Sequence, residues 1–213
     1  MFKKIAFVSV ALFVVINLCA QEKKDTTVVP GYVMDPISIR DVWSANNTSP
    51  FAVTNILPKD IEKINTGVDL PFLLRFTPSM TVTSDAGNGI GYTGLWIRGS
   101  DPTRVNVSIN GIPLNDPESQ QVFWVNTPDL ASSSSRIQIQ RGIGTSANGT
   151  GSFGGSIHID TDAHLERNFV RFNASIGSFN STKGMIELGT KIGKKFELNA
   201  RESGIGSSGY IDR

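Results

Sequence analysis

The chain has 213 residues, of which 39% are hydrophobic and 18% are charged. This composition supports one or two folded domains and excludes a wholly disordered chain. Twenty basic residues stand against nineteen acidic residues, so the formal net charge is only +1. A near-neutral chain lacks the strong positive field that nucleic-acid-binding proteins use, and we expect no nucleic-acid partner.

The first twenty residues differ from the rest of the chain. Two lysines precede an apolar run from Ile5 to Ile16, and Ala20 precedes a polar residue. The pattern predicts a secretory signal peptide over residues 1–20. The alternative, a membrane anchor, is disfavoured because the run is short for a hydrocarbon core of about 30 Å. Cleavage after Ala20 would remove Cys19, the only cysteine, so the exported chain would fold without disulfides.

Residues 21–49 mix charges and prolines without a hydrophobic period, which predicts a flexible segment. Order is expected from Pro50 onward. The stretch PFAVTNI suits a strand, and PKDIEKIN suits a short helix with Pro58 at its start. A second helix is expected to begin at Asp69 as its N-cap and to run to just before Pro78.

A small domain with mixed strands is expected from these helices onward. The stretch MTVTS predicts a strand, followed by a glycine-rich loop and the strand LWI. Residues 104–109 alternate between apolar and polar side chains before Asn110-Gly111, a strong hairpin signal. After a polar loop and a short turn or helix, RIQIQRG and SIHIDT supply two more strands. We therefore expect an α+β domain over residues 50–163.

From Asn168 the pattern changes to three strands, each with one apolar and one polar face. Val170, Phe172 and Ile176 alternate with polar residues in the first strand, and two similar strands follow. A transmembrane β-barrel needs this period of two, because lipid meets one face and a wet lumen the other. A soluble sandwich with one solvated face shows the same pattern. Because three strands leave an unpaired edge, we expect residues 164–213 to begin a larger sheet in a longer protein.

Catalytic and metal-binding patterns are weak. His158, Asp160, Asp162 and His164 alternate and would share one face of a continuous strand, but a solvated polar face is the ordinary explanation. Two G-x-G-x-x-G spans precede strands rather than helices, which disfavours a nucleotide site. No nucleophile elbow surrounds the serine-rich stretch near residue 133. We expect no enzyme activity, no bound metal and no cofactor.

The order of several motifs resembles that of the TonB-dependent outer-membrane receptors of Gram-negative bacteria. The motifs are IRG, INGIPLND, IQIQRG and GSFGGSIHIDT, followed by amphipathic strands. The resemblance implies an α+β plug domain followed by the first antiparallel strands of a transmembrane β-barrel of about 22 strands. It also implies an outer-membrane location, with the barrel in contact with lipid and the N-terminal segment in the periplasm.

The resemblance further implies two contact sites on the plug. One is a TonB box, a periplasmic segment that would pair as a strand with the partner protein TonB. An ordinary linker is the alternative. The box would consist of Asp25, Thr26, Thr27, Val28, Val29 and Pro30. The other site is a pair of arginines, Arg98 and Arg141, that would contact barrel glutamates.

Two plug loops, Ser84 to Gly94 and Pro113 to Asn126, match the loops that meet the solute in this family. Their polar and aromatic residues suit a ligand site. The candidate contacts are Asn88, Tyr92, Asn115, Asp116, Gln120, Gln121, Phe123 and Trp124.

The function implied is energy-coupled uptake of a scarce solute, with an iron chelate of the siderophore type first and cobalamin or haem next. The inner-membrane complex that energises TonB would be a further partner. The alternative is an exported, non-enzymatic binding or adhesion module, or a receptor fragment without function.

Overall fold

The computed structural model describes residues 51–143, 149, 151–161, 165, 167–193 and 196–211. All of these residues lie in one compact unit of the chain, Arg40–Arg213. The predicted signal peptide and the predicted TonB box lie outside the described residues.

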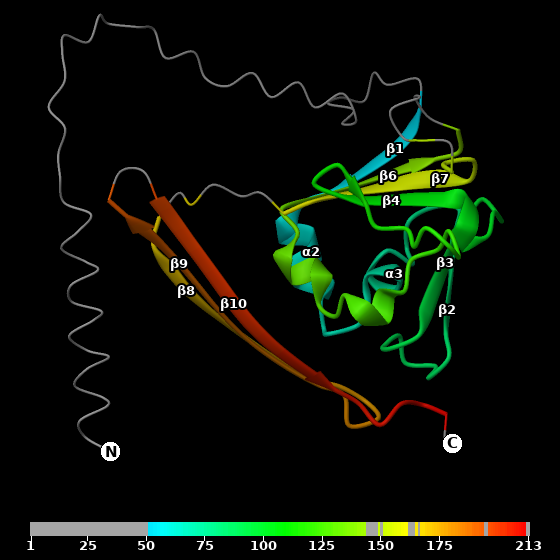
Figure 1. Ribbon diagram of the computed structural model, residues 1–213. Coiled ribbons are helices and arrows are strands. Elements are labelled where there is room, and N and C mark those ends of the chain that lie inside the picture. Colours follow the sequence, from blue (N-terminus) through cyan, green and yellow to red (C-terminus); the bar gives the residue numbers. More distant parts are fainter. Residues whose placement is uncertain are drawn as a thin grey trace, which may run out of the picture. The chain divides into compact units, whose positions relative to one another are not determined.

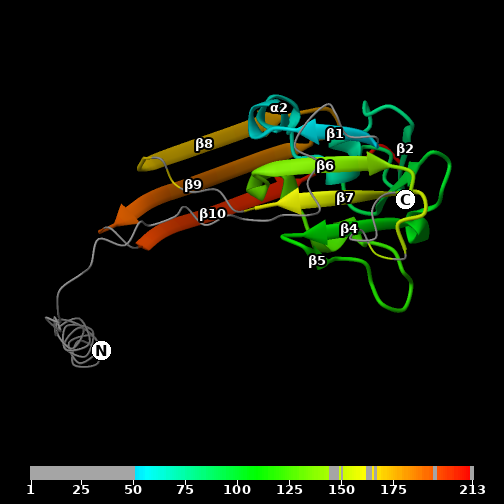
Figure 2. The same ribbon diagram turned by 90° about the horizontal axis from the view of Figure 1, so that it is seen from above.

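A mixed five-stranded sheet forms the centre of the plug domain, as the sequence predicted (Figures 1 and 2). Neighbouring strands are antiparallel except β4 and β7, which are parallel. The strands, in spatial order, are β1 (Ala52–Ile56), β6 (Arg136–Arg141), β7 (Gly155–Asp160), β4 (Val105–Ile109) and β5 (Ile112–Pro113).

Short helices and a two-stranded ribbon complete the plug. The ribbon pairs β2 with β3 in antiparallel register. Its strands are β2 (Met80–Ser84) and β3 (Thr93–Ile97). The helices are α2 (Pro58–Ile64), α3 (Leu70–Leu73) and the 3₁₀ turns η1 (Pro102–Arg104), η2 (Trp124–Asn126) and η3 (Leu130–Ser133).

The hydrophobic core lies on one face of the five-stranded sheet. Alternate positions of the three inner strands supply branched aliphatic side chains that are almost fully buried. Leu74, Leu95 and Ile97 pack in the same cluster. Each buried side chain of this size contributes about 1.5–3 kcal/mol of transfer free energy. The sheet residues of the core are Val105, Val107, Ile137, Ile139, Ile157 and Ile159.

The opposite face of the same sheet is polar and also buried. Gln138, Gln140, Ser156 and His158 are each less than 5% exposed. Strict alternation in the sequence suggests a strand with one solvated face, yet every residue of β7 is buried. The period of two therefore predicted which side chains share a face but not whether that face meets water.

The second predicted helix is shorter than expected. Asp69 is its N-cap, but α3 ends at Leu73, and Phe76, expected in its body, is exposed. The Asp69 side chain does not cap the helix and instead accepts a hydrogen bond of 2.9 Å from Thr93 Oγ1. Burial of this carboxyl is the main reason that its pKa is raised.

The predicted hairpin at Asn110-Gly111 is confirmed but has one short arm. Both turn residues have positive φ, 51° and 83°, as a type I′ turn requires. The returning strand β5 has only two residues, and the other edge of β4 pairs with β7. Asn110 also bonds to Thr161 at the end of β7, donating to Oγ1 at 2.7 Å and accepting from the backbone N–H at 2.9 Å.

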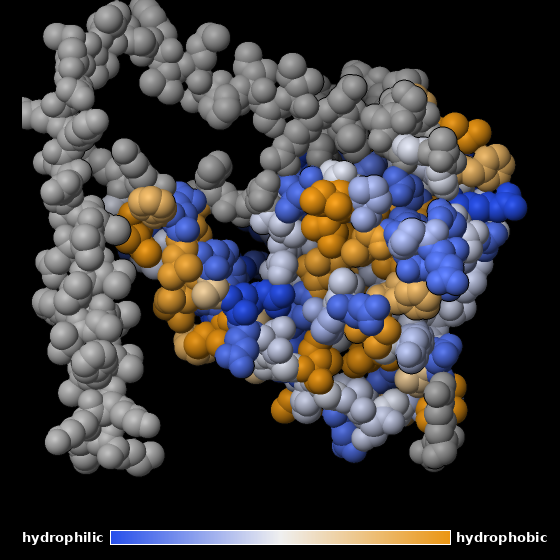
Figure 3. All heavy atoms as spheres, in the orientation of Figure 1, coloured by the Kyte–Doolittle hydropathy of each residue, from blue (hydrophilic) through white to orange (hydrophobic). Residues whose placement is uncertain are grey.

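Three long antiparallel strands follow the plug: β8 (Phe169–Ile176), β9 (Thr182–Ile192) and β10 (Phe196–Gly206), with β9 in the middle. Their apolar residues gather on one exposed face, 41–90% exposed (Figure 3). Polar side chains of the opposite face contact the plug. Among the described residues, no helix has the length and apolar character needed to span a membrane. The apolar face comprises Val170, Phe172, Ile176, Ile186, Leu188, Ile192, Phe196 and Leu198.

The core assignment predicts a clear difference between two isoleucine substitutions. Ile157→Ala removes a fully buried side chain from the central strand β7 and should lower the free energy of unfolding by about 2–5 kcal/mol. Ile112→Ala, at a position that is 72% exposed, should change it by less than about 0.5 kcal/mol. Urea denaturation measures both, and equal effects would contradict the assigned core.

Candidate functional site

The two Arg-Gly steps lie next to each other in space. Arg98 directly follows β3 with φ of 53°, and its backbone N–H donates to the carbonyl of Ser79 at 2.8 Å. Gly142 directly follows β6 with φ of 87°. A Cβ at Gly142 would lie 2.5 Å from Arg98 Nη1, so the glycine leaves room for the arginine. The tertiary structure thus joins two motifs that are about forty positions apart in the sequence.

Arg141 has hydrogen-bond donors left over within this part of the fold. Its Nη1 lies 3.5 Å from the carbonyl of Pro78, at the limit for a hydrogen bond. Its Nε is buried and has no partner among the described residues. The next residue, Gly142, lines an open hollow together with Arg98, Ile143 and Phe153. A guanidinium in such a position favours a carboxylate partner, because its planar fork binds carboxylates in bidentate fashion.

The loop from Ser84 to Gly94 is held by the segment that follows β10. Asn88 Nδ2 donates to Ser207 Oγ at 2.6 Å, and the backbone N–H of Tyr210 donates to the carbonyl of Ala86 at 2.8 Å. Tyr92 is 63% exposed. A cavity of about 430 Å³ lies between the loop and this segment, with walls formed by Asp85, Ala86, Ile90, Gly91, Tyr92, Ser208, Gly209 and Ile211.

Three predicted contacts of the second loop shape its backbone. Asn115 accepts a hydrogen bond from Val107 N–H at 2.8 Å and donates to the carbonyls of Val105 and Gln120. Asp116 accepts bonds from the backbone N–H and hydroxyl of Ser119, and these bonds lower the pKa of Asp116. Gln120 has φ of 60° and donates from Nε2 to the carbonyl of Pro117.

The remaining predicted contacts of this loop divide between surface and core. Phe123 is 41% exposed and Gln121 is half-buried. Trp124 is only 4% exposed and belongs to the hydrophobic core. The expectation that Trp124 adds aromatic surface to the loop therefore differs from the structure, because η2 turns its ring into the core near β3.

Two of the four residues of the alternating His/Asp pattern are described, and both are buried in β7. His158 Nδ1 lies 2.7 Å from Ser108 Oγ, and burial lowers the pKa of His158 to about 4. Asp160 is 6% exposed. Asp162 and His164 lie outside the described residues. Within the part of the chain that the structure describes, no three His, Cys, Asp or Glu residues are grouped as metal ligands.

Charged residues between the plug and the long strands were not predicted as a site. Asp129, at the start of η3, contacts Lys183 of β9 and Arg201 of β10. The only signal in the sequence is that both cations occupy inward positions of amphipathic strands. Which plug residue they meet depends on packing.

A protein-family comparison agrees with this architecture. The model for the TonB-dependent receptor plug domain matches residues 45–156, and thus covers more than half of the chain. The chain belongs to this family. A curated relative, the vitamin B12 transporter BtuB of Vibrio cholerae, is 28% identical over 155 residues, which is 73% of this chain and 25% of the relative.

Solved structures show the same fold at lower identity. The siderophore receptor PirA of Acinetobacter baumannii matches with a TM-score of 0.55 and 19% identity, over 72% of this chain and 24% of that one. The ferric-catecholate import receptor Fiu of E. coli K12 matches with a TM-score of 0.57 and 18% identity, over 75% of this chain and 22% of that one. The chain spans about a quarter of the length of the curated relatives it matches.

The close approach of Arg98 to Gly142 predicts a cost for adding a methyl group. Gly142→Ala should lower the free energy of unfolding by at least about 1–2 kcal/mol, because it forces a left-handed backbone on alanine and displaces Arg98. Gly151→Ala is the control, since nothing lies within 4 Å of a Cβ there. Chemical denaturation measures both, and equal stability of the two variants would contradict the described packing.

Burial of His158 predicts a pH dependence of stability. The unfolded chain binds a proton at this side chain below about pH 6.5, whereas the folded chain stays neutral there until about pH 4. Stability should therefore fall as the pH falls through this window, by about 2 kcal/mol between pH 7.5 and 4.5. Urea midpoints of the wild type and His158→Gln isolate this contribution. The same pH dependence in both proteins would overturn the prediction.

Proposed function

We propose that this chain forms the plug and the first barrel strands of an outer-membrane receptor that imports a scarce solute with energy supplied through TonB. The observation that carries the proposal is the two-sided character of β8–β10. Their apolar face is exposed, and Lys183 and Arg201 of their polar face bond to Asp129 of the plug. In a barrel wall, lipid would cover the apolar face and the plug would offer polar partners to the opposite face.

An exported binding or adhesion module, the alternative function, fits this observation less well. In water, the exposed row of apolar side chains on β8–β10 would be a site of aggregation. A membrane removes this difficulty without any change in the chain. The placement of the receptor in an outer membrane rests on the same argument and on the family.

For the solute, we propose a metal chelate, with an iron siderophore as the first candidate. Tyr92 and Phe123 expose aromatic surface, and Asn88 and Gln121 are half-buried polar residues of the same two loops. This mixture suits a chelate with an organic shell. Similarity to siderophore receptors supports the fold and the class. Cobalamin is the second candidate, because the curated relative at 28% identity is a vitamin B12 transporter.

The proposed role of Asn115, Asp116 and Gln120 is to fix the conformation of the loop that would contact the solute. Their side chains hold the backbone between β5 and η2. Substitution of these residues would therefore alter loop conformation in addition to any direct contact. Trp124 supports the loop from the core.

Arg98 and Arg141 are proposed to contact carboxylates of the barrel. The support is the Nε of Arg141, which has no partner among the described residues, and the open hollow that Arg98 and Gly142 line. Carboxylates of the barrel at this place would pair with the two guanidinium groups and so help to hold the plug inside the barrel.

Residues Asp25 to Pro30 are proposed as the TonB box. Their β-branched composition suits strand addition to a partner sheet. TonB would pair with this segment from the periplasm and transmit force to the plug.

Deletion of Asp25–Pro30 in the full-length receptor gene should abolish uptake and leave solute binding unchanged, because the box would act only in energy transfer. Growth on ferric siderophores under iron limitation, and on cobalamin as the required vitamin, measures uptake. Labelled solute on whole cells measures binding. Deletion of the six residues Ile37–Val42 is the length-matched control and should retain uptake. Uptake that survives the loss of Asp25–Pro30 would disprove the TonB-box assignment.

A further inference from the structure

Asp129 is a buried carboxylate at the corner of the plug that faces the long strands. It is the N-cap of η3, has φ of 53°, and its side chain has no solvent exposure. Two neutral plug groups contact it, since Ser132 Oγ donates at 2.6 Å and Asn65 Nδ2 at 3.3 Å. Neutral donors alone leave a buried carboxylate poorly compensated.

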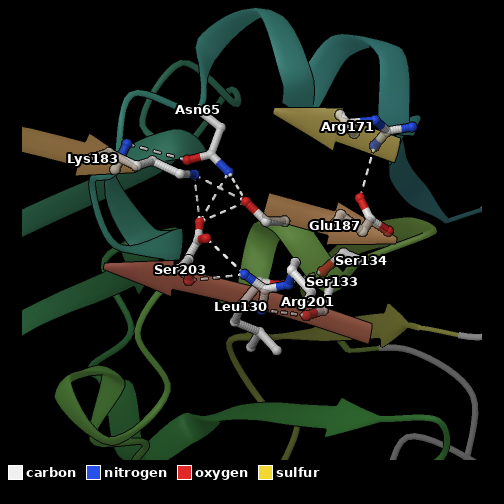
Figure 4. A network of polar contacts seen from close by, with 12 residues as sticks. Asn65, Leu130, Ser133, Ser134, Arg171, Lys183, Glu187, Arg201 and Ser203 are labelled. Atoms are coloured by element: carbon white, nitrogen blue, oxygen red, sulfur yellow. Dashed lines mark hydrogen bonds and ion pairs between the residues drawn. The ribbon is translucent and has the colours of Figure 1, made fainter. Parts of the chain in front are cut away.

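The cations that compensate Asp129 come from the long strands. Lys183 Nζ of β9 lies 2.6 Å from Oδ1, and Arg201 Nη1 of β10 lies 2.7 Å from Oδ2. Figure 4 shows Lys183, Arg201 and Asn65 pointing toward this common centre. Lys183 is 1% exposed and Arg201 is 20% exposed, so water screens these pairs weakly. We call Asp129, Lys183, Arg201, Asn65 and Ser132 the Asp129 cluster.

The pairing outweighs the burial of the carboxyl. Burial by itself would raise the pKa of Asp129, but hydrogen bonds from Lys183 and Ser132 and the charge of Lys183 lower it below its usual range. Asp129 therefore remains ionised at neutral and mildly acidic pH. The pairing loses strength only in stronger acid, as the pH falls through the lowered pKa.

The shape of the plug surface favours the same placement of the plug on the long strands as the Asp129 cluster does. Gly67 follows α2 with φ of 102°, and a Cβ there would lie 3.1 Å from Cβ of Lys183. Ser175 Oγ of β8 donates to the carbonyl of Thr66 at 2.9 Å. Lys183 thus enters the plug surface where a glycine leaves space. A plug shifted along the strands would lose both contacts and leave the buried charges of Asp129 and Lys183 unpaired.

A second ion pair lies nearer to solvent. Arg171 of β8 contacts Glu62 of α2 at 2.9 Å and Glu187 of β9 at 3.3 Å. Arg171 and Glu62 are each about half exposed, so this contact contributes little to binding energy. The buried Asp129 cluster is the part of the interface that can select one position.

We propose that Asp129 is a positioning residue that holds the plug in one register against the second and third long strands. In this contact the plug supplies the anion and the strands supply the cations. In the contact proposed for Arg98 and Arg141, the plug supplies the cations and the barrel the anions. The inference rests on the proposed receptor architecture, but it concerns docking of the plug and requires no uptake.

Hydrogen–deuterium exchange on the full-length receptor in detergent, without solute, tests the proposal. Lys183→Met should speed exchange of the backbone amides of η3 and the end of α2 at least tenfold, while β6 and β7 amides stay unchanged. Arg201→Met should act in the same direction with a smaller effect, because Arg201 is less buried. Lys183→Arg, which retains the charge, should stay within about threefold of the wild type.

Asp129→Asn should match Lys183→Met, and the double variant should speed exchange by less than the product of the two single effects. Lys191→Met is the control on the same strand, at a position with 43% side-chain exposure, and should change nothing. Unchanged η3 exchange in Lys183→Met and Arg201→Met would overturn the proposal. Equal acceleration of η3, β6 and β7 would also overturn it, because Asp129 would then stabilise the plug fold and not its position. A receptor that fails to import solute but shows the predicted exchange would refute only the proposed uptake function.

Discussion

Burial of charged side chains on the polar face of β9 and β10 against the plug is the constraint on which the rest of the structure depends. A strand with one apolar and one polar face needs two different environments. The exposed face carries phenylalanine, valine, leucine and isoleucine, while the opposite face carries Lys183, Glu187 and Arg201. The plug supplies carboxylate and hydroxyl partners to that polar face. Without these partners, buried charges would carry a large desolvation cost.

The plug meets this requirement because the strands of its central sheet are paired and packed on a hydrophobic core. β7 pairs on both sides, antiparallel with β6 and parallel with β4, and its apolar residues fill the core. Loops and 3₁₀ turns leave the ends of these strands at defined places. Both Arg-Gly steps and η3 depend on this frame, which is how Arg98, Gly142 and Asp129 reach their neighbours. These contacts therefore lie in the connections between strands, which the packed sheet positions.

Local signals in the sequence were reliable where a single residue type decides the geometry. Asn110-Gly111 forms the expected turn, Pro58 begins α2, and the alternating segments form strands β4, β6 and β7. The signals were less reliable where packing decides. α3 ends four residues before the expected limit near Thr77, and Trp124 turns into the core although its neighbours form a polar loop. The burial of Trp124 depends on core residues that are distant in sequence.

The sequence by itself determined the family, the mixed strands of the plug and the two-faced character of the last three strands, because motif order and a period of two are local properties. Only the tertiary structure decided which charges meet. Asp129 is separated from Lys183 by 54 positions and from Arg201 by 72, and nothing in the spacing pairs them. The pairing follows from where the plug packs on the strands. Electrostatic complementarity between distant segments exists only after both have folded.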